Sequence, residues 1–448
     1  MRRRNMLTGA VALAAVAPVA VRSVAAQPAG KTKILFWHAM AASLGEEVSR
    51  LCRGFNASQA EYEIEPIFKG SYPETLTAAI AAWRAGQAPH LVQMFEVGTG
   101  SMLAAGPAVK QIWQLSQETG VALDPGAYIS GVRGYYSLTD GRLASMPFNS
   151  STSVMWYNKD AFEKAGLNPD APPTTWQQVV EATRTLKSKN ATPIPMTTMW
   201  PTWVQFEQYA AMHDLVYATK SNGFDGLDTE LKINAPPFVK HLQRLLDMSK
   251  EGTFKYGGRD TAAEPLFLSG EAAITFNSSA GRAAIARDAK FRWAGALLPT
   301  DPEVNAKPNN SIIGGASLWV MTTPARTAAE YKGAALFLKF LGQPDNDAQW
   351  SQNTGYVPVT TAGYEMTKAQ GFYEKNVGTD IPITQLRRGT LTDNSRGFRL
   401  GRMAELRNII QEELEKALQG QQTAQAALDL SVTRGNRVLR DFEKSARG

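Results

Sequence analysis

The strongest candidate for chemistry is an arginine on the apolar face of a predicted helix. In "RMAELRNIIQEELEKAL", an advance of about 100° per residue places Arg407 within the arc of Met403, Leu406, Ile410 and Leu414. Burying a guanidinium costs several kcal/mol unless an anion and hydrogen bonds compensate it. Its planar donors match the oxygens of a phosphate or carboxylate. An internal salt bridge and a bound anionic ligand are both consistent with this pattern.

Aromatic, hydroxyl and glycine residues form further candidate sites. Trp200 and Trp203 flank Pro201 in "MWPTW", where they either pack in the core or form a platform for the C–H faces of a sugar or glycerol unit. The segments "FNSSAG" and "IIGGASLWVM" bring backbone N–H groups close together, as in anion-binding nests. Gly314 and Gly315 could equally mark ordinary turns.

Catalytic motifs are scarce. The four histidines, His38, His90, His213 and His241, are dispersed, and neither a P-loop lysine signature nor a G-x-S-x-G elbow is present. A phosphodiester hydrolase using Glu96 as its base is the alternative from another class, but it lacks a metal cluster and a second placed acid. We therefore expect a protein that is not an enzyme, with no metal and no cofactor.

The elements that must position these residues alternate between strand and helix. "KILFWH", "YEIEPIF" and "LVQMF" read as strands, and helical patterns over 44–55 and from Pro73 lie between them. This alternation predicts an α/β fold with mainly parallel sheets flanked by helices, which bind ligands beyond the carboxyl ends of the strands. Glu96 directly follows one such end. Farther along, Thr174 and Gln177 predict a capping box for the next helix.

The chain of 448 residues is too long for one core, since cores stop growing at roughly 250 to 300 residues. We expect two lobes. No Pro-rich or Gly/Ser-rich linker separates them, which favours short crossings that can act as a hinge. The stretch "MPFNSSTSVMWYNKDAF", with four adjacent hydroxyl residues from Ser150 to Ser153, is a candidate crossing.

The N-terminus resembles an export signal. Residues 1–26 combine a basic start, a short apolar run broken by Pro18 and a small-residue cleavage site after Ala26, and Arg3 with Arg4 also fits a twin-arginine signal. Removing the four arginines of this segment lowers the formal charge from +6 to +2. Without a block of like charges, no nucleic-acid partner is expected. Cys52, the only cysteine, is predicted to be a buried thiol.

Taken together, several segments resemble one family over essentially the whole mature chain. They are "KILFWHAM", "KGSYPETL", "APHLVQMFEVGTG", "PFNSSTSVMWYNKDAFEKAG", "NSIIGGASLWVM", "TGYVPVT" and "RLGRMAELR". This order of motifs is similar to that of the periplasmic glycerol-3-phosphate-binding proteins of ABC importers. The resemblance implies a two-lobed fold that closes on its ligand by hinge bending, with lobe I formed by 27–149 and 279–342 and lobe II by 151–277 and 345–448.

The resemblance also implies a ligand site, residue by residue. The phosphate would be surrounded by Arg407, Ser278, Tyr356 and the Gly315 amide. The glycerol hydroxyls would face Tyr72 and Glu96, and the ligand would also contact Ser151 at the crossing. An aromatic floor would be formed by Trp200 and Trp203. The implied partners are glycerol-3-phosphate and the permease transmembrane subunits, and the implied state is a monomer in the periplasm. A neutral sugar receptor of the same fold is the alternative.

Three residues depart from the family pattern. Arg282 follows the serines of "FNSSAGRAA", and Met199 and Pro201 surround the tryptophans. These changes could shift the preference towards glycerophosphodiesters such as glycerophosphocholine, because its cationic head favours an aromatic surface.

Overall fold

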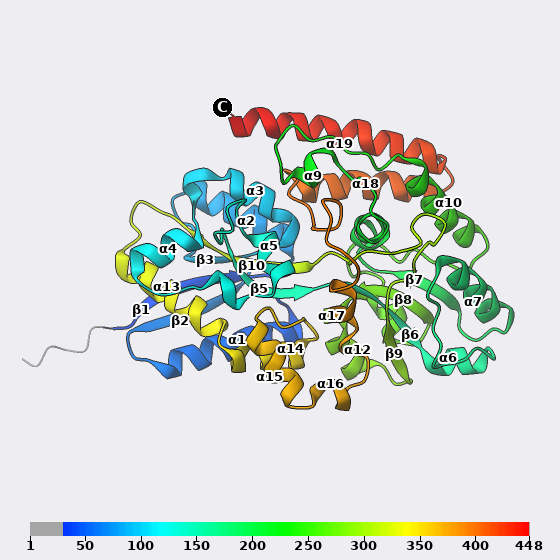
Figure 1. The fold of residues 1–448 in the computed structure, drawn as a ribbon, viewed down its shortest axis with the longest axis horizontal. Helices are drawn as coiled ribbons and strands as arrows, with labels where there is room; N and C mark the ends of the chain where they lie inside the picture. The colour runs from blue at the N-terminus through cyan, green and yellow to red at the C-terminus, as the bar shows by residue number, and fades with distance from the viewer. Residues whose placement is uncertain (1–29, 448) are drawn as a thin grey trace, which may run out of the picture.

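The computed structural model describes residues 30–447, so the predicted signal peptide, 1–26, lies outside the described residues. Figure 1 shows two β-sheets side by side, each flanked by helices, with α18 and α19 lying across the top of the view. The predicted α/β class is confirmed. Because β5 leads directly into β6, the two sheets are joined where the candidate crossing was expected.

The first sheet has the strand order β2-β1-β3-β10-β4, and β5 also pairs with β10. Its strands are β1 (Thr32–His38), β2 (Tyr62–Phe68), β3 (Leu91–Phe95), β4 (Val109–Lys110), β5 (Met146–Ser151) and β10 (Gly314–Met321). The helices that follow these strands are α1 (Ala42–Ser58), α2 (Tyr72–Arg84), α3 (Thr99–Ala104), α4 (Ile112–Thr119), α5 (Ser130–Tyr136) and α13 (Ala328–Leu341), with 3-10 turns η1 (Glu96–Gly98), η2 (Gly106–Ala108) and η3 (Pro125–Ala127).

The second sheet has the order β7-β8-β6-β9. Its strands are β6 (Ser153–Asn158), β7 (Ile194–Thr198), β8 (Ala272–Ser278) and β9 (Trp293–Ala296). The remaining helices are α6 (Lys159–Lys164), α7 (Trp176–Ser188), α8 (Tyr209–Met212), α9 (Thr219–Gly223), α10 (Pro236–Lys250), α11 (Glu264–Leu268), α12 (Arg282–Asp288), α14 (Pro344–Thr354), α15 (Thr361–Ala369), α16 (Phe372–Lys375), α17 (Ile381–Leu386), α18 (Met403–Leu418) and α19 (Ala424–Arg447), with a π-helical turn η4 (Trp203–Gln208) and a 3-10 turn η5 (Ser279–Gly281).

Strand pairing is mixed rather than mainly parallel. Parallel pairing is limited to β1 with β2 and β3 in the first sheet and to β7 with β8 in the second. β10 runs antiparallel to β3, β4 and β5, and β6 runs antiparallel to β8 and β9. The cause is the chain path: strands that enter a sheet from the other lobe run against the strands built by the local strand–helix alternation.

Two segments lie in a different lobe from the one that the sequence predicts. β9 belongs to the second sheet because it pairs with β6, although the prediction placed 279–342 in lobe I. α14 packs against α1, and Trp350 and Tyr356 lie in the core of the first lobe, although the prediction placed 345–448 in lobe II. Strand pairing sets the first assignment and apolar packing sets the second, and the linear pattern reveals neither.

The helix cap of α7 differs by one residue from the cap that the sequence predicts. The capping box of α7 is formed by Thr175 and Gln178 rather than by Thr174 and Gln177. The Gln178 side-chain oxygen additionally accepts hydrogen bonds from the N–H and hydroxyl of Thr174. Both positions hold a threonine, and the predicted capping box is therefore wrong by one residue. Cys52 is buried and unpaired, as predicted.

Two kinds of feature are absent from residues 30–447. No helix in this part of the chain is long and apolar enough to cross a membrane. Within the same residues, no three or more His, Cys, Asp or Glu side chains gather in a way that could hold a metal ion.

Candidate functional site

The crossing between the sheets brings four predicted site residues together. Ser151 ends β5 and pairs with Gly314, while Ser150 pairs with Gly315. Immediately after the crossing, Ser153 of β6 pairs with Ser278 of β8. Ser150 also forms an isolated bridge with Val357, the neighbour of Tyr356. Ser151, Gly315, Ser278 and Tyr356, which are far apart in sequence, therefore surround a single point of passage between the lobes.

Glycine is required at the start of β10. Gly315 has φ +92°, and a Cβ built there would lie 1.9 Å from the carbonyl oxygen of Asn149. A Cβ at Gly314 would lie 2.4 Å from the ring of Trp203. The two glycines thus let β10 approach β5 and let the Trp203 indole lie against bare backbone. An ordinary turn alone therefore does not explain why both positions are glycine.

Tyr72 and Asn149 connect the crossing to the first lobe. The Tyr72 ring stacks on Phe95, with centroids 5.5 Å apart and 10° between planes, and its hydroxyl accepts a 2.9 Å hydrogen bond from Asn149 Nδ2. Asn149 in turn accepts a 2.8 Å hydrogen bond from Gln93. A fully buried amide therefore fixes the Tyr72 hydroxyl at the edge of the candidate site.

Arg407 forms two ion pairs, one to each lobe. Its Nε and Nη2 each donate a 2.7 Å hydrogen bond to the carboxylate of Glu207, in η4. Nη2 also donates to Glu96, in η1 of the first lobe, at 2.8 Å. The side chain of Arg407 is 14% exposed, and Nη1 bonds to neither carboxylate. One guanidinium therefore joins the lobes and retains a donor for a further acceptor.

The charge at this point is not balanced, because two carboxylates share one cation. Burial raises the pKa of Glu96, and Arg407 lowers it again while the neighbouring Glu207 raises it. Burial alone would lower the pKa of Arg407, but Glu207 and Glu96 outweigh burial and raise it. Arg407 thus stays charged, and the pKa of Glu96 lies above that of an ordinary glutamate.

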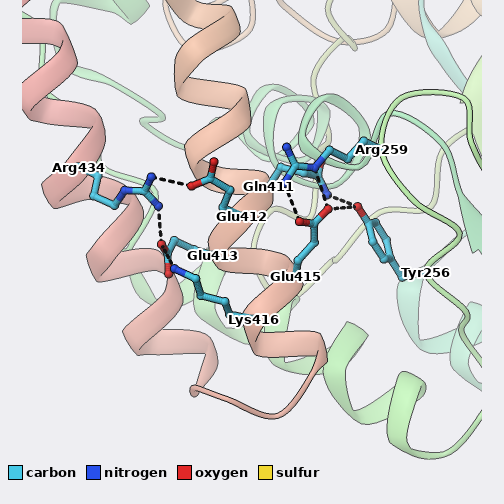
Figure 2. Close-up of polar contacts among 8 residues, drawn as sticks. All are labelled: Tyr256, Arg259, Gln411, Glu412, Glu413, Glu415, Lys416 and Arg434. Carbon is cyan, nitrogen blue, oxygen red and sulfur yellow. Dashed lines mark hydrogen bonds and ion pairs between the residues drawn. The ribbon is translucent and has the colours of Figure 1, made fainter.

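A second set of contacts holds α18, the helix that carries Arg407. Gln411 and Glu415 follow Arg407 at intervals of four residues and so lie on the same face of α18. Figure 2 shows Glu415 facing Arg259 and Tyr256. Arg259 donates through Nε and Nη2 to Glu415 at 2.8 and 2.6 Å, the Tyr256 hydroxyl donates at 2.7 Å, and Gln411 donates to that hydroxyl. This cluster ties α18 to the loop 252–263.

α19 holds the opposite face of α18. Arg434 donates to Glu412 and to Glu413 at 2.6 Å each, and Lys416 pairs with Glu413 at 2.8 Å (Figure 2). The Glu413 side chain is 2% exposed, whereas Arg434 and Lys416 are 37% and 46% exposed, so solvent screens these pairs in part. Contacts on two faces fix the rotation of α18 and hence the direction of Arg407.

The two tryptophans occupy different environments. Trp203 is 5% exposed and begins η4, the π-helical turn that also carries Glu207. π-turns are rare and frequently mark functional sites. Trp200 is half-buried, has φ +47° and donates its backbone N–H to the carbonyl of Asp260 at 2.7 Å. The loop held by Glu415 therefore also fixes the strained backbone of Trp200.

Several polar atoms at the crossing have no partner in the described part of the chain. Ser150 Oγ and Trp203 Nε1 are buried without a hydrogen bond. Ser278 Oγ accepts from the N–H of Ala280, which leaves its hydroxyl proton available. Buried polar groups are nearly always satisfied, so unsatisfied ones at a candidate site indicate where a ligand would bond.

The crossing thus joins four predicted site residues, Tyr72 is linked to it through Asn149, and Glu96 pairs with Arg407. Sequence reasoning missed two neighbours of these residues. Glu207 was missed although it is the only acidic residue in the buried run 201–212, a signal of the kind that identified Arg407. Asn149 was missed because only the fold reveals its hydrogen bond to Tyr72.

Comparison with known proteins gives consistent results. Residues 50–376 match the family of bacterial extracellular solute-binding proteins. The chain is 46% identical to the sn-glycerol-3-phosphate-binding periplasmic protein UgpB of Pectobacterium atrosepticum over 97% of each chain. It is 44% identical to the protein of that name from Rhizobium meliloti, over 92% of this chain and 95% of the relative.

Solved structures of lower identity share the fold. UgpB from Mycobacterium tuberculosis in complex with glycerophosphocholine superimposes with a TM-score of 0.76 at 22% identity, covering 92% of this chain and 99% of that one. The cyclic alpha-maltosyl-1,6-maltose binding protein from Arthrobacter globiformis gives a TM-score of 0.72 at 20% identity, covering 92% and 100%. Both support the two-lobed architecture.

Proposed function

Because the chain belongs to the family of bacterial extracellular solute-binding proteins, we propose that it is the periplasmic receptor of an ABC importer for sn-glycerol-3-phosphate. Relatives of 43–46% identity over nearly the full length carry that ligand in their names. The observation that carries the proposal is that predicted ligand residues from distant parts of the chain meet at the interlobe crossing, while Arg407 joins Glu96 of one lobe to Glu207 of the other.

In this proposal the two ends of the ligand meet different groups. Arg407 Nη1, the hydroxyls of Ser278 and Tyr356 and the Gly315 amide take the phosphate, whose oxygens accept several donors at once. Tyr72 and Glu96 take the glycerol hydroxyls, since a carboxylate accepts two such protons. Ser151 contacts the ligand from the crossing, and Trp200 and Trp203 form the floor under its carbon atoms.

Binding would be coupled to hinge closure, because one ligand contacts residues of both lobes. The protein would release the ligand unchanged to the transmembrane subunits of the permease, and it would act as a monomer without a cofactor. Glycerophosphodiesters such as glycerophosphocholine are proposed as further ligands. Trp200, half-buried at the edge of the site, could pack against a cationic head.

One observation favours the alternative of a neutral sugar receptor. Arg407 already has two carboxylate partners, as expected if its charge is satisfied internally. In that case the tryptophans would stack on sugar rings. The free Nη1 of Arg407 and the identity to named glycerol-3-phosphate receptors favour the phosphate ester.

Thermal unfolding with a ligand panel separates these functions, since a ligand raises the melting temperature by mass action. The panel holds glycerol-3-phosphate, glycerophosphocholine, glycerol, inorganic phosphate and maltose at equal concentration. The proposal expects the largest increase with one of the two phosphate esters. An increase with maltose alone would establish the sugar receptor instead.

A further inference from the structure

A small cavity lies beside the proposed ligand site, where three distant segments of the chain meet. Its volume is about 20 Å³, enough for one water-sized particle. Its walls come mainly from the turn after β8, from the stretch between Ser351 and Pro358, and from the segment 372–383; Val154 and Trp156 of β6 and Gly295 of β9 complete them. Tyr356, one of the proposed phosphate ligands, is part of the wall, so the cavity adjoins the proposed ligand site.

Three side chains in this wall carry buried donors that have no hydrogen-bond partner within residues 30–447. They are the hydroxyl of Ser279, the Nε–H of Arg282 and the hydroxyl of Tyr373. Ser279 is 1% exposed, so water at the surface does not satisfy it. One buried donor without an acceptor lowers the stability of a folded protein by about 1–3 kcal/mol, which a protein can tolerate. Three in one cavity wall indicate a common acceptor.

Arg282 is the only charged residue in the cavity wall. No carboxylate in the described chain pairs with it, and its Nη1 and Nη2 reach only two neutral oxygens, those of Gln352 at 3.3 Å and Asn376 at 3.4 Å. Its guanidinium also lies over the ring of Phe372, 5.5 Å from the centroid. Burial lowers the pKa of Arg282, as expected for a cation that lacks a counter-charge.

We propose that this cavity binds a single halide-sized anion, such as chloride, held by Arg282, Ser279 and Tyr373. The charge and the donors select an anion over water, because a water molecule has two protons of its own that need acceptors and would leave the guanidinium uncompensated. A cavity of about 20 Å³ suits one small ion, so we place this site apart from that of the transported ligand.

An anion here would connect the segments that form the cavity. Ser279 begins η5, the 3-10 turn capped by Ser278, Arg282 directly follows that turn, and Tyr373 belongs to α16. Bridging them would fix the turn after β8 and, with it, the hydroxyl of Ser278. The expected consequence is a more stable folded state in chloride than in a larger anion.

The first experiment measures the melting temperature of the full-length mature protein at one ionic strength, in sodium chloride and in sodium methanesulfonate, whose anion exceeds the cavity. We expect a higher melting temperature in chloride that rises with chloride concentration, by mass action. Arg282→Met should abolish this increment. Arg287→Met, on the exposed face of the same helix, should retain it. Equal melting temperatures in both salts, or an increment retained by Arg282→Met, would overturn the proposal.

The second experiment does not depend on a variant. Crystals of the wild-type protein soaked in sodium bromide are expected to show an anomalous scattering peak between Arg282 and Ser279. An ordered water without anomalous signal at that position would show that the cavity is a hydration site and would contradict the anion assignment.

Discussion

Arg407 is the side chain on which the binding account depends most, because it contacts both lobes and two carboxylates at once. Arg407→Met should lower the free energy of unfolding by about 3 kcal/mol, since it leaves Glu96 and Glu207 buried without a cation. Adding Glu207→Gln should recover part of that stability. It should not recover affinity for glycerol-3-phosphate, which we expect to fall by about 2 kcal/mol or more, roughly 30-fold.

Chemical unfolding and calorimetry of these variants distinguish the two roles of Arg407. Arg437→Met is the matched control, because Arg437 is exposed on α19. Unchanged affinity in a folded Arg407→Met protein would show that Arg407 serves only as an internal salt bridge.

Gly315 offers a test of the backbone at the crossing. Gly315→Ala should destabilise the protein by about 2 kcal/mol or more, because φ is +92° and the new Cβ would overlap the Asn149 carbonyl. Gly134→Ala, where nothing lies within 4 Å of the new Cβ, is the control and should be neutral or slightly stabilising. Equal urea midpoints for both variants would contradict the close approach of β5 and β10.

At the scale of elements, α18 connects the site to its support. Glu415→Gln should weaken the hydrogen bonds that hold the 252–263 loop against α18. Because this loop holds the backbone of Trp200, ligand affinity should fall several-fold. Stability should change by less than about 1 kcal/mol, since the pair with Arg259 is partly exposed. The matched control is Glu251→Gln, which breaks the exposed bidentate pair with Arg184. If both variants bind ligand equally well, the contacts of Glu415 with the 252–263 loop do not position the proposed aromatic floor.

Sequence patterns identified most elements but not their pairing. Arg407 stood out because one charged residue interrupts an apolar helical face, and Glu96 because it follows a buried strand. The same reasoning could not find that β9 and α14 belong to the opposite lobes from those assigned, because both depend on contacts between distant residues. Nor could it find that Glu96 and Glu207 share Arg407, since those carboxylates lie 311 and 200 residues away in sequence.

At the scale of the whole molecule, burial of the histidines makes stability depend on pH. All four have a pKa below the ordinary value, chiefly through burial, to about 4 for His38 and His213. The unfolded chain therefore binds protons near pH 6.5, whereas the folded chain does not. This contribution is complete above about pH 6.5 and is lost as the pH falls towards 4, by up to about 3 kcal/mol each for His38 and His213.

Urea unfolding between pH 7.5 and 4.5 measures this dependence. His213→Gln should show a shallower loss of stability on acidification than the wild type, because one fewer proton is taken up on unfolding. Identical slopes for the two proteins would exclude His213 as a contributor.

Calorimetric titration of the mature protein with glycerol-3-phosphate and, separately, with maltose tests the central claim most directly. The account predicts saturable binding of one glycerol-3-phosphate per chain and no binding of maltose. Saturable binding of maltose with no response to glycerol-3-phosphate would contradict it.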